Sequence, residues 1–247
     1  MRKLLIIAMA LAIPALAPAQ VVWYDSFGFE PPAGYVPGPL PGQDGWLPDS
    51  TAGQSVPVVV ADPTGLLSGQ VAQFDAINGL GGWCGALVTP TGGADARLVG
   101  PIVHVEWDQV RVDTDDNFWH TPDFAGWSQF GLQWDGTGLL HSDSWAAGEP
   151  TGPITPLALD HIDLIYTGPP GATSITLLIN GTNFGTAPTA GGTPVFVDWV
   201  FEMEDTAAGV SHGRLLMDNF RITVIPEPSI FLLAGLGLLA LLRRRRK

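Results

Sequence analysis

Short runs in which apolar and polar residues alternate recur along the middle of this chain. In the clearest runs every second position is apolar: Val103, Val105 and Trp107; Phe130, Leu132 and Trp134; and Ile175, Leu177 and Ile179. A period of two is typical of a strand with one buried face. Asn180 and Gly181 follow the third run and predict a tight hairpin turn.

Two further segments, 195–201 and 216–224, are rich in β-branched and aromatic residues and complete the predicted strands. Segments rich in Gly and Pro separate the runs at 37–42, 89–93, 167–171 and 186–194. No stretch between them predicts a helix. We therefore predict an all-β fold, an antiparallel β-sandwich (jelly roll) over residues 20–225, with an N-terminal signal helix and a short hydrophobic C-terminal helix.

The N-terminus is typical of a secretory signal. Arg2 and Lys3 precede an apolar run at 4–16, and Ala17 and Ala19 are the small residues that signal peptidase reads. The run is short and Pro14 interrupts it, which disfavours a permanent membrane helix. We predict that residues 1–19 are a signal peptide, removed before Gln20.

The C-terminus carries a second apolar run, 230–242, without a charged residue. As a helix it would rise about 20 Å, short of the ~30 Å hydrocarbon core. A basic cluster follows and would stay cytoplasmic by the positive-inside rule: Arg243, Arg244, Arg245, Arg246 and Lys247. These features predict transient insertion into the inner membrane; an ordinary tail anchor stays the alternative.

Pro226, Glu227 and Pro228 precede this apolar run, and with the arginine cluster they resemble the PEP-CTERM sorting signal over residues 226–247. The resemblance implies recognition by an exosortase in a Gram-negative-type envelope. It also implies delivery to the cell surface or the extracellular matrix. The Pro-Glu-Pro residues and the arginines would be substrate features of that enzyme.

Charge is distributed unevenly along the chain. The net charge is −13, but residues 20–225 hold 23 acidic residues against four arginines, Arg97, Arg111, Arg214 and Arg221, which leaves −19 there. Such a domain repels phosphate backbones, so we expect no nucleic-acid partner. It suits divalent cations, neutral sugars or a basic partner, or the acidity serves solubility alone. Cys84 is the one cysteine, which excludes an intrachain disulfide.

Two segments of the domain resemble the concanavalin A-like and laminin-G-like jelly rolls and related carbohydrate-binding modules. They are 24–30, with the Pro/Gly loop that ends at Trp46, and 216–222, which has the pattern of a closing strand. The resemblance implies that the first and last strands lie side by side. It also implies a structural calcium shared by Glu30 and Asp218, although these could be unrelated surface acids.

The stretch 118–127, expected to be a loop, is the best candidate for a ligand site. It holds Trp119, His120, Asp123 and Trp127. Aromatic rings can stack on the C–H face of a pyranose and carboxylates can accept its hydroxyl hydrogens. The alternative is that these tryptophans only fill the core.

Sequence patterns of enzymes do not fit. Glu106 and Asp108 match the first part of the Glu-x-Asp-x-x-Glu motif of laminarinase-like glycoside hydrolases, but Arg111 stands where the general acid belongs. The five histidines show no metal-ligand spacing. We therefore expect no catalytic residues and a non-catalytic exported protein that binds polysaccharide. Two alternatives stay open, a divergent extracellular glycan hydrolase and a self-associating structural surface protein.

Overall fold

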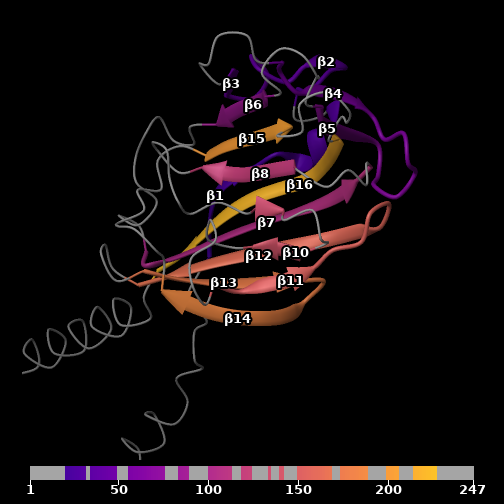
Figure 1. The fold of residues 1–247 in the computed structure, drawn as a ribbon. Helices are drawn as coiled ribbons and strands as arrows, with labels where there is room; N and C mark the ends of the chain where they lie inside the picture. Colours follow the sequence, from indigo (N-terminus) through magenta and orange to yellow (C-terminus); the bar gives the residue numbers. More distant parts are fainter. Residues whose placement is uncertain are drawn as a thin grey trace, which may run out of the picture.

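A computed structural model describes the following parts of the chain: residues 20–31, 34–48, 55–75, 83–88, 100–112, 118–123, 133–134, 139–141, 149–168, 173–188, 199–205 and 214–226. Apart from one short 3-10 helix, η1 (Phe27–Phe29), the regular elements among them are strands (Figure 1). Within these ranges no helix is long and apolar enough to cross a membrane. The predicted signal and tail helices lie outside the described residues.

The described strands form three sheets, of nine, four and three strands. The nine-stranded sheet has the order β14 (Thr182–Pro188), β13 (Ser174–Ile179), β12 (Leu159–Thr167), β7 (Ile102–Arg111), β16 (Arg214–Ile225), β5 (Gln70–Asp75), β4 (Val58–Ala61) and β2 (Gly38–Pro39), with β1 (Val21–Asp25) also paired to β16. The four-stranded sheet has the order β3 (Trp46–Pro48), β6 (Trp83–Val88), β15 (Trp199–Asp205) and β8 (Phe118–Asp123). The small sheet has the order β11 (Thr151–Pro153), β10 (Leu139–His141) and β9 (Gln133–Trp134).

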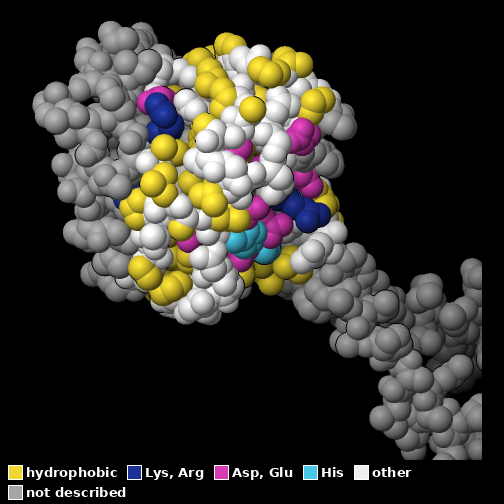
Figure 2. All heavy atoms as spheres, turned by 90° about the vertical axis from the view of Figure 1, so that its right-hand side faces the viewer, with side chains coloured by type: hydrophobic (Ala, Val, Ile, Leu, Met, Phe, Trp, Pro, Cys, Tyr) yellow, Lys and Arg dark blue, Asp and Glu magenta, His cyan; other side chains and the backbone are white. Residues whose placement is uncertain are grey.

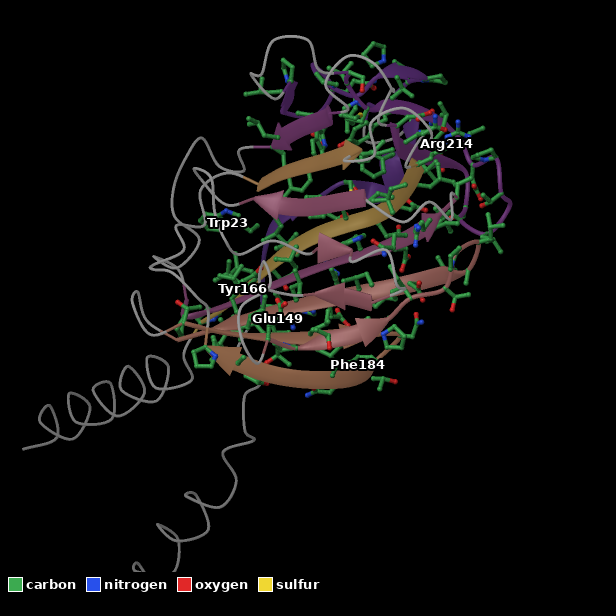
Figure 3. The ribbon with its side chains drawn as sticks, in the orientation of Figure 1. Trp23, Glu149, Tyr166, Phe184 and Arg214 are labelled. Carbon is green, nitrogen blue, oxygen red and sulfur yellow. The ribbon has the colours of Figure 1, made fainter. Side chains whose placement is uncertain are left out.

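Every pair of these named strands is antiparallel. Side chains of both larger sheets meet in one core, which includes Trp46, Ala86 and Val88 from the four-stranded sheet. Figure 3 labels Trp23, Tyr166 and Phe184, which come from β1, β12 and β14 and contribute to or pack against this core. The predicted all-β antiparallel sandwich is therefore confirmed.

Alternation on β7 separates a core face from an outer face. Val103, Val105 and Trp107 are fully buried, whereas His104, Glu106 and Asp108 are only partly buried. On β13 the predicted Ile175, Leu177 and Ile179 are buried in the same way. Asn180 and Gly181 both have positive φ, 52° and 74°, and join β13 to β14 as the predicted hairpin turn.

The first and last strands lie side by side, as the jelly-roll resemblance implies. Val21 pairs with Val224, so both ends of the described domain lie at the same end of the sandwich. Side chains from the two segments that resemble jelly rolls, 24–46 and 216–222, pack together beside this pair of strands. Trp46 lies 6.3 Å from Tyr24 and 5.9 Å from Phe220 between ring centroids, and its indole N–H donates to Tyr35 Oη at 3.1 Å.

Two expectations change. Residues 118–123 form strand β8 instead of a loop, because they pair along their whole length with β15. The predicted strand 216–224 is longer at both ends, as β16 (Arg214–Ile225), and its pairing with β7 has a register irregularity between Asp218 and Arg221. Phe130, Leu132 and residues 195–198 lie outside the described residues.

Candidate functional site

Glu30 and Asp218 lie together at one rim of the nine-stranded sheet. Glu30 follows η1, and Asp218 lies on β16 just before its irregularity. Gly28 lies beside both, because a Cβ built on it would be 3.2 Å from Asp218 Oδ1 and 3.8 Å from Glu30 Cγ. Its φ of 68° favours glycine as well. The fold thus joins two acids from opposite ends of the domain sequence.

The loop between β4 and β5 holds Glu30 in place. The backbone N–H of Gln70 donates to Glu30 Oε1 at 2.9 Å. Gly69, at φ 72°, passes so close that any side chain there would collide with the Glu30 carboxylate. Asp62 orders the loop itself, since it accepts hydrogen bonds from the backbone N–H groups of Thr64 and Leu67, both at 2.8 Å. The position of the Glu30 carboxylate is therefore set by backbone contacts.

Asp218 is a buried acid, with 1% of its surface exposed. Burial raises the pKa of Asp218, and the nearby carboxylates of Asp108 and Glu30 raise it further. Backbone N–H groups of Asn219, at 2.8 Å, and of Ser68 offset part of this effect, and the resulting pKa is about 6. Without a bound cation, the charged form of this carboxyl is thus less favoured than in an ordinary aspartate.

The groups at this rim are the oxygen donors that calcium prefers. A third oxygen, Asn219 Oδ1, lies near the Glu30 and Asp218 carboxylates, because it would be 3.3 Å from a Cβ built on Gly28. Two buried oxygens of the segments that carry these groups, Ser26 Oγ and Gln70 Oε1, lack a hydrogen-bond partner within the described structure. Ca²⁺ takes six to eight oxygens, so the Glu30, Asp218 and Asn219 oxygens could supply only part of the predicted calcium site. The calcium itself stays a prediction.

The predicted ligand site falls on β8 and beyond it. Trp119 pairs with Glu204, His120 with Met203 and Asp123 with Val200 on β15. Successive positions of a strand belong to opposite faces, so the positions of Trp119 and Asp123 share one face and that of His120 belongs to the other. Trp127 lies outside the described residues. These residues stay a prediction as a ligand site, with His120 set apart from the other two.

The sorting residues begin where β16 ends. Pro226 directly follows the strand and is buried. Glu227, Pro228 and the arginine cluster, Arg243, Arg244, Arg245 and Arg246, lie outside the described residues.

Sequence reasoning missed a cluster on the outer face of the nine-stranded sheet, where His104, Glu106 and Asp163 meet. Their side chains come from neighbouring strands, β7 and β12, that are distant in sequence. The alternation predicts which residues of each strand face outward. It does not predict the register in which β7 and β12 pair. A search for ligands spaced along one segment therefore passes over this cluster.

Residues 224–247 match the model of the PEP-CTERM protein-sorting motif. This match confirms the predicted sorting motif at the C-terminus. The motif indicates an exported protein that is sorted to the cell envelope, and it implies processing by an exosortase. Among curated proteins, none matches the chain significantly in sequence.

Solved structures show the same fold at very low sequence identity. The chain is similar to a sialidase, with a TM-score of 0.53 and 10% identity over 73% of this chain, and spans only 17% of the sialidase chain. It is also similar to the endo-β-1,4-glucuronan lyase of the fungus Trichoderma reesei, with a TM-score of 0.52 and 8% identity over 76% of this chain and 93% of the lyase. These likenesses show a β-sandwich of the jelly-roll class and nothing further about activity.

Proposed function

We propose that this exported protein presents a non-catalytic, polysaccharide-binding β-sandwich at the cell surface or in the extracellular matrix. The signal peptide would be removed before Gln20, and exosortase would process the tail after it inserts briefly into the inner membrane. The sandwich would carry a structural calcium ion between Glu30 and Asp218. A divergent glycan hydrolase and a self-associating surface protein are the alternatives to be tested.

The observation that carries this proposal is the position of the end of β16, where the sequence of the sorting tail begins, relative to the Glu30/Asp218 rim. The tail leaves at the end of β16, next to the start of β1. Asp218 lies seven residues earlier on the same strand, roughly 20 Å away at the rise of a β-strand. Figure 1 shows β16 running across the sandwich between these two ends. While the tail is still inserted, this rim would therefore lie at the end of β16 that is farther from the membrane.

Fold and charge support a glycan as the ligand. Two solved structures with this fold are, by name, a sialidase and a glucuronan lyase, both named for carbohydrate chemistry. The net charge of −13 disfavours nucleic acid and anionic lipid and favours neutral sugars. Trp119 and Asp123, at positions on one face of β8, are the residues expected to contact the sugar.

Retention on a panel of immobilised polysaccharides tests the proposal. The mature protein should be retained on at least one neutral polysaccharide without releasing oligosaccharide. Released oligosaccharide would support the hydrolase instead. Failure to bind any polysaccharide, together with concentration-dependent assembly, would support the self-associating protein.

A matched pair of variants sharpens this test. Trp119→Ala should lose retention by about five- to tenfold, because one stacked ring contributes on the order of 1 kcal/mol. Val36→Ala removes an apolar side chain that is 59% exposed elsewhere, and it should leave retention unchanged. Equal retention by both variants would exclude the β8 site but not polysaccharide binding as such.

Calcium is tested separately, by thermal unfolding with and without a chelator. We expect calcium to raise the melting temperature of the wild type and to leave Glu30→Gln and Asp218→Asn unaffected, since each removes one carboxylate ligand. A wild-type melting temperature that does not respond to chelator would remove the calcium from the proposal.

A further inference from the structure

Two histidines and three carboxylates share the outer face of the nine-stranded sheet. The register of β7 and β12 places His161 opposite Asp108 and Asp163 opposite Glu106, with His104 one outward position further along β7. Figure 2 shows histidine side chains on the surface, bordered by acidic side chains. All five positions alternate with buried core residues, so the strand pleat turns them toward solvent.

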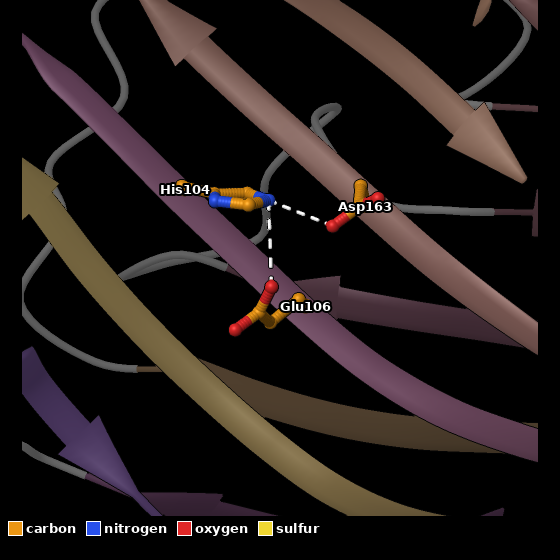
Figure 4. A group of neighbouring side chains, drawn as sticks. All are labelled: His104, Glu106 and Asp163. Carbon is orange, nitrogen blue, oxygen red and sulfur yellow. Dashed lines mark hydrogen bonds and ion pairs between the residues drawn. The ribbon is translucent and has the colours of Figure 1, made fainter. Parts of the chain in front are cut away.

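The nitrogen and oxygen atoms of this cluster converge on Asp163. His104 Nε2 lies 2.7 Å from Asp163 Oδ1 and 3.8 Å from Glu106 Oε2, and one ligand atom from each of the three lies within 4.8 Å of the others (Figure 4). His161, two residues before Asp163 on β12, has its Nε2 atom 3.4 Å from the same Asp163 oxygen. One imidazole nitrogen, from His104, and the carboxylates of Glu106 and Asp163 therefore surround one small volume, and His161 borders it beside Asp163.

Asp108 orients His161 toward this volume. Asp108 Oδ1 lies 2.7 Å from His161 Nδ1, and Asp108 Oδ2 accepts a hydrogen bond from Asn219 Nδ2 at 2.8 Å. When His161 is neutral and donates its Nδ1 proton to Asp108, the lone pair of Nε2 is directed away from Asp108, toward Asp163. A carboxylate behind the second ring nitrogen is the usual support of a metal-bound histidine. This support is independent of the ligand distances.

Charge at the cluster also favours a cation. Arg221 is the guanidinium paired with Glu106 in the described structure, at 3.7 Å from Nη1 to Oε1, and it is shared with Asp25 at 3.5 Å. Arg221 is thus the permanent cation beside several carboxylates here, and His104 and His161 add positive charge only when protonated. A divalent ion would offset the remaining repulsion between Glu106, Asp108 and Asp163.

We propose that His104, His161, Asp163 and Glu106 form a binding site for a divalent transition-metal ion of the zinc class, with Asp108 as the positioning residue. Imidazole nitrogen combined with carboxylate oxygen selects zinc-class ions over calcium, which prefers oxygen alone. The site therefore differs in ligand chemistry from the Glu30/Asp218 rim. The proposal does not depend on polysaccharide binding.

Only small side-chain movements are needed to close this site on an ion. The ligand atoms of tetrahedral zinc lie roughly 3.3 Å apart, given bond lengths near 2.0–2.1 Å. Among His104, Glu106 and Asp163, the closest pair, His104 and Asp163, must open slightly from 2.7 Å, and separations of up to 4.8 Å must close. His161 Nε2, which lies outside that group, must move closer to His104 and Glu106. Side chains on the solvent face of a sheet can make such adjustments without moving the backbone. The ligands thus need rotamer changes and no change of strand register.

Isothermal titration of the calcium-saturated mature protein with zinc chloride tests the proposal. The protein should carry no polyhistidine tag and should be stripped of transition metals first. We expect one saturable zinc ion per chain. Cobalt(II), titrated in place of zinc, should give the visible absorption of a four- or five-coordinate site with nitrogen and oxygen ligands.

Variants separate ligands from bystanders. His104→Gln, His161→Gln and Asp163→Asn should each weaken zinc binding by about 100-fold or more, because each removes one of four ligands. Asp108→Asn should weaken it by about 10- to 100-fold and keep the stoichiometry, as expected for a positioning residue. Asp75→Asn, which removes a carboxylate that pairs with Arg214 and is not part of the cluster, should bind zinc like the wild type. All five variants should keep the circular dichroism spectrum of the wild type.

Two results would overturn the proposal. The first is the absence of saturable binding at one zinc ion per chain in the wild type. The second is unchanged zinc affinity in the double variant His104→Gln/His161→Gln, which would mean that zinc binds elsewhere. Because the titration contains no polysaccharide, its failure would leave the polysaccharide proposal intact.

Discussion

Two clusters of carboxylates on the same sheet differ in what surrounds them. The rim cluster, Glu30 with Asp218, and the outer-face cluster, His104 with Glu106, Asp163 and His161, lie on either side of Asp108. That residue pairs with Asp218 on β16 and with His161 on β12. The comparison shows how one strand can supply two sites of different chemistry.

The pKa values of Asp218 and Asp163 move in opposite directions. Burial and the neighbouring acids raise the pKa of Asp218 to about 6. Partial burial also acts to raise the pKa of Asp163, but the hydrogen bonds and charges of His104 and His161 outweigh it and hold that pKa below its ordinary value. The residue type is the same, so the neighbours decide which form is favoured.

The largest effect is expected from Gly69→Ala at the rim. A methyl group there would collide with the Glu30 carboxylate and break its bond to the Gln70 N–H, in addition to straining a residue at φ 72°. We expect a loss of about 3–5 kcal/mol in the free energy of unfolding, measured by urea denaturation.

Gly65→Ala is the matched control for this variant. Gly65 has nearly the same φ, 70°, but a Cβ there meets nothing within 4 Å. It should cost only about 1 kcal/mol from backbone strain. Equal losses in the two variants would show that Gly69 does not hold the rim cluster.

The next effect is a pH dependence at the rim, measured in a chelator. The pKa of Asp218 is raised in the folded state from 3.8 to about 6, so its stabilising contribution is present below 3.8 and is lost as the pH rises through about 6. Relative to Asp218→Asn, the wild type should lose roughly 2 kcal/mol in free energy of unfolding between pH 4 and pH 7. A difference that does not change with pH would contradict the raised pKa.

A smaller effect of opposite sign is expected on the outer face. The pKa of Asp163 is lowered in the folded state, so its contribution is present above 3.8 and is lost as the pH falls through its lower folded value. In a chelator at about pH 5, Asp163→Asn should cost on the order of 1 kcal/mol, because the ion pair is only partly buried. Urea denaturation should show this cost fading at lower pH; a cost that grows on acidification would be incompatible with it.

The smallest effect on stability is expected at Asn219, which connects the two clusters. Its side chain donates to Asp108 at 2.8 Å, and its φ of 51° suits glycine. Asn219→Gly should therefore change the free energy of unfolding by less than about 1 kcal/mol, since the lost hydrogen bond is offset by relief of the backbone. We expect it to weaken zinc binding severalfold in the titration. Unchanged zinc affinity would show that Asn219 does not help Asp108 to hold His161.

Much of the fold could be predicted from local patterns. The period of two on β7 and β13 correctly assigned the buried residues, and the Asn180–Gly181 turn joins its two strands as expected. The same patterns misjudged residues 118–123, expected to be a loop. Their place as a strand depends on pairing with β15, which local composition does not encode.

The candidate sites were predictable to different degrees. Resemblance to a fold family named Glu30 and Asp218, and the structure places them at one rim. The outer-face cluster was missed, because its histidines stand 57 positions apart and meet only through the register of β7 with β12. The PEP-CTERM motif was found because its parts are contiguous in sequence.

The sequence by itself determined the properties that short segments can carry. These are the alternation that gives strands a buried face, the turn residues, the segregation of charge and the sorting tail. Tertiary structure alone decided which carboxylates face each other, which of them are buried, and which receive a histidine. The physical reason is that alternation depends on neighbouring residues, whereas strand register and burial depend on the packing of the whole sandwich.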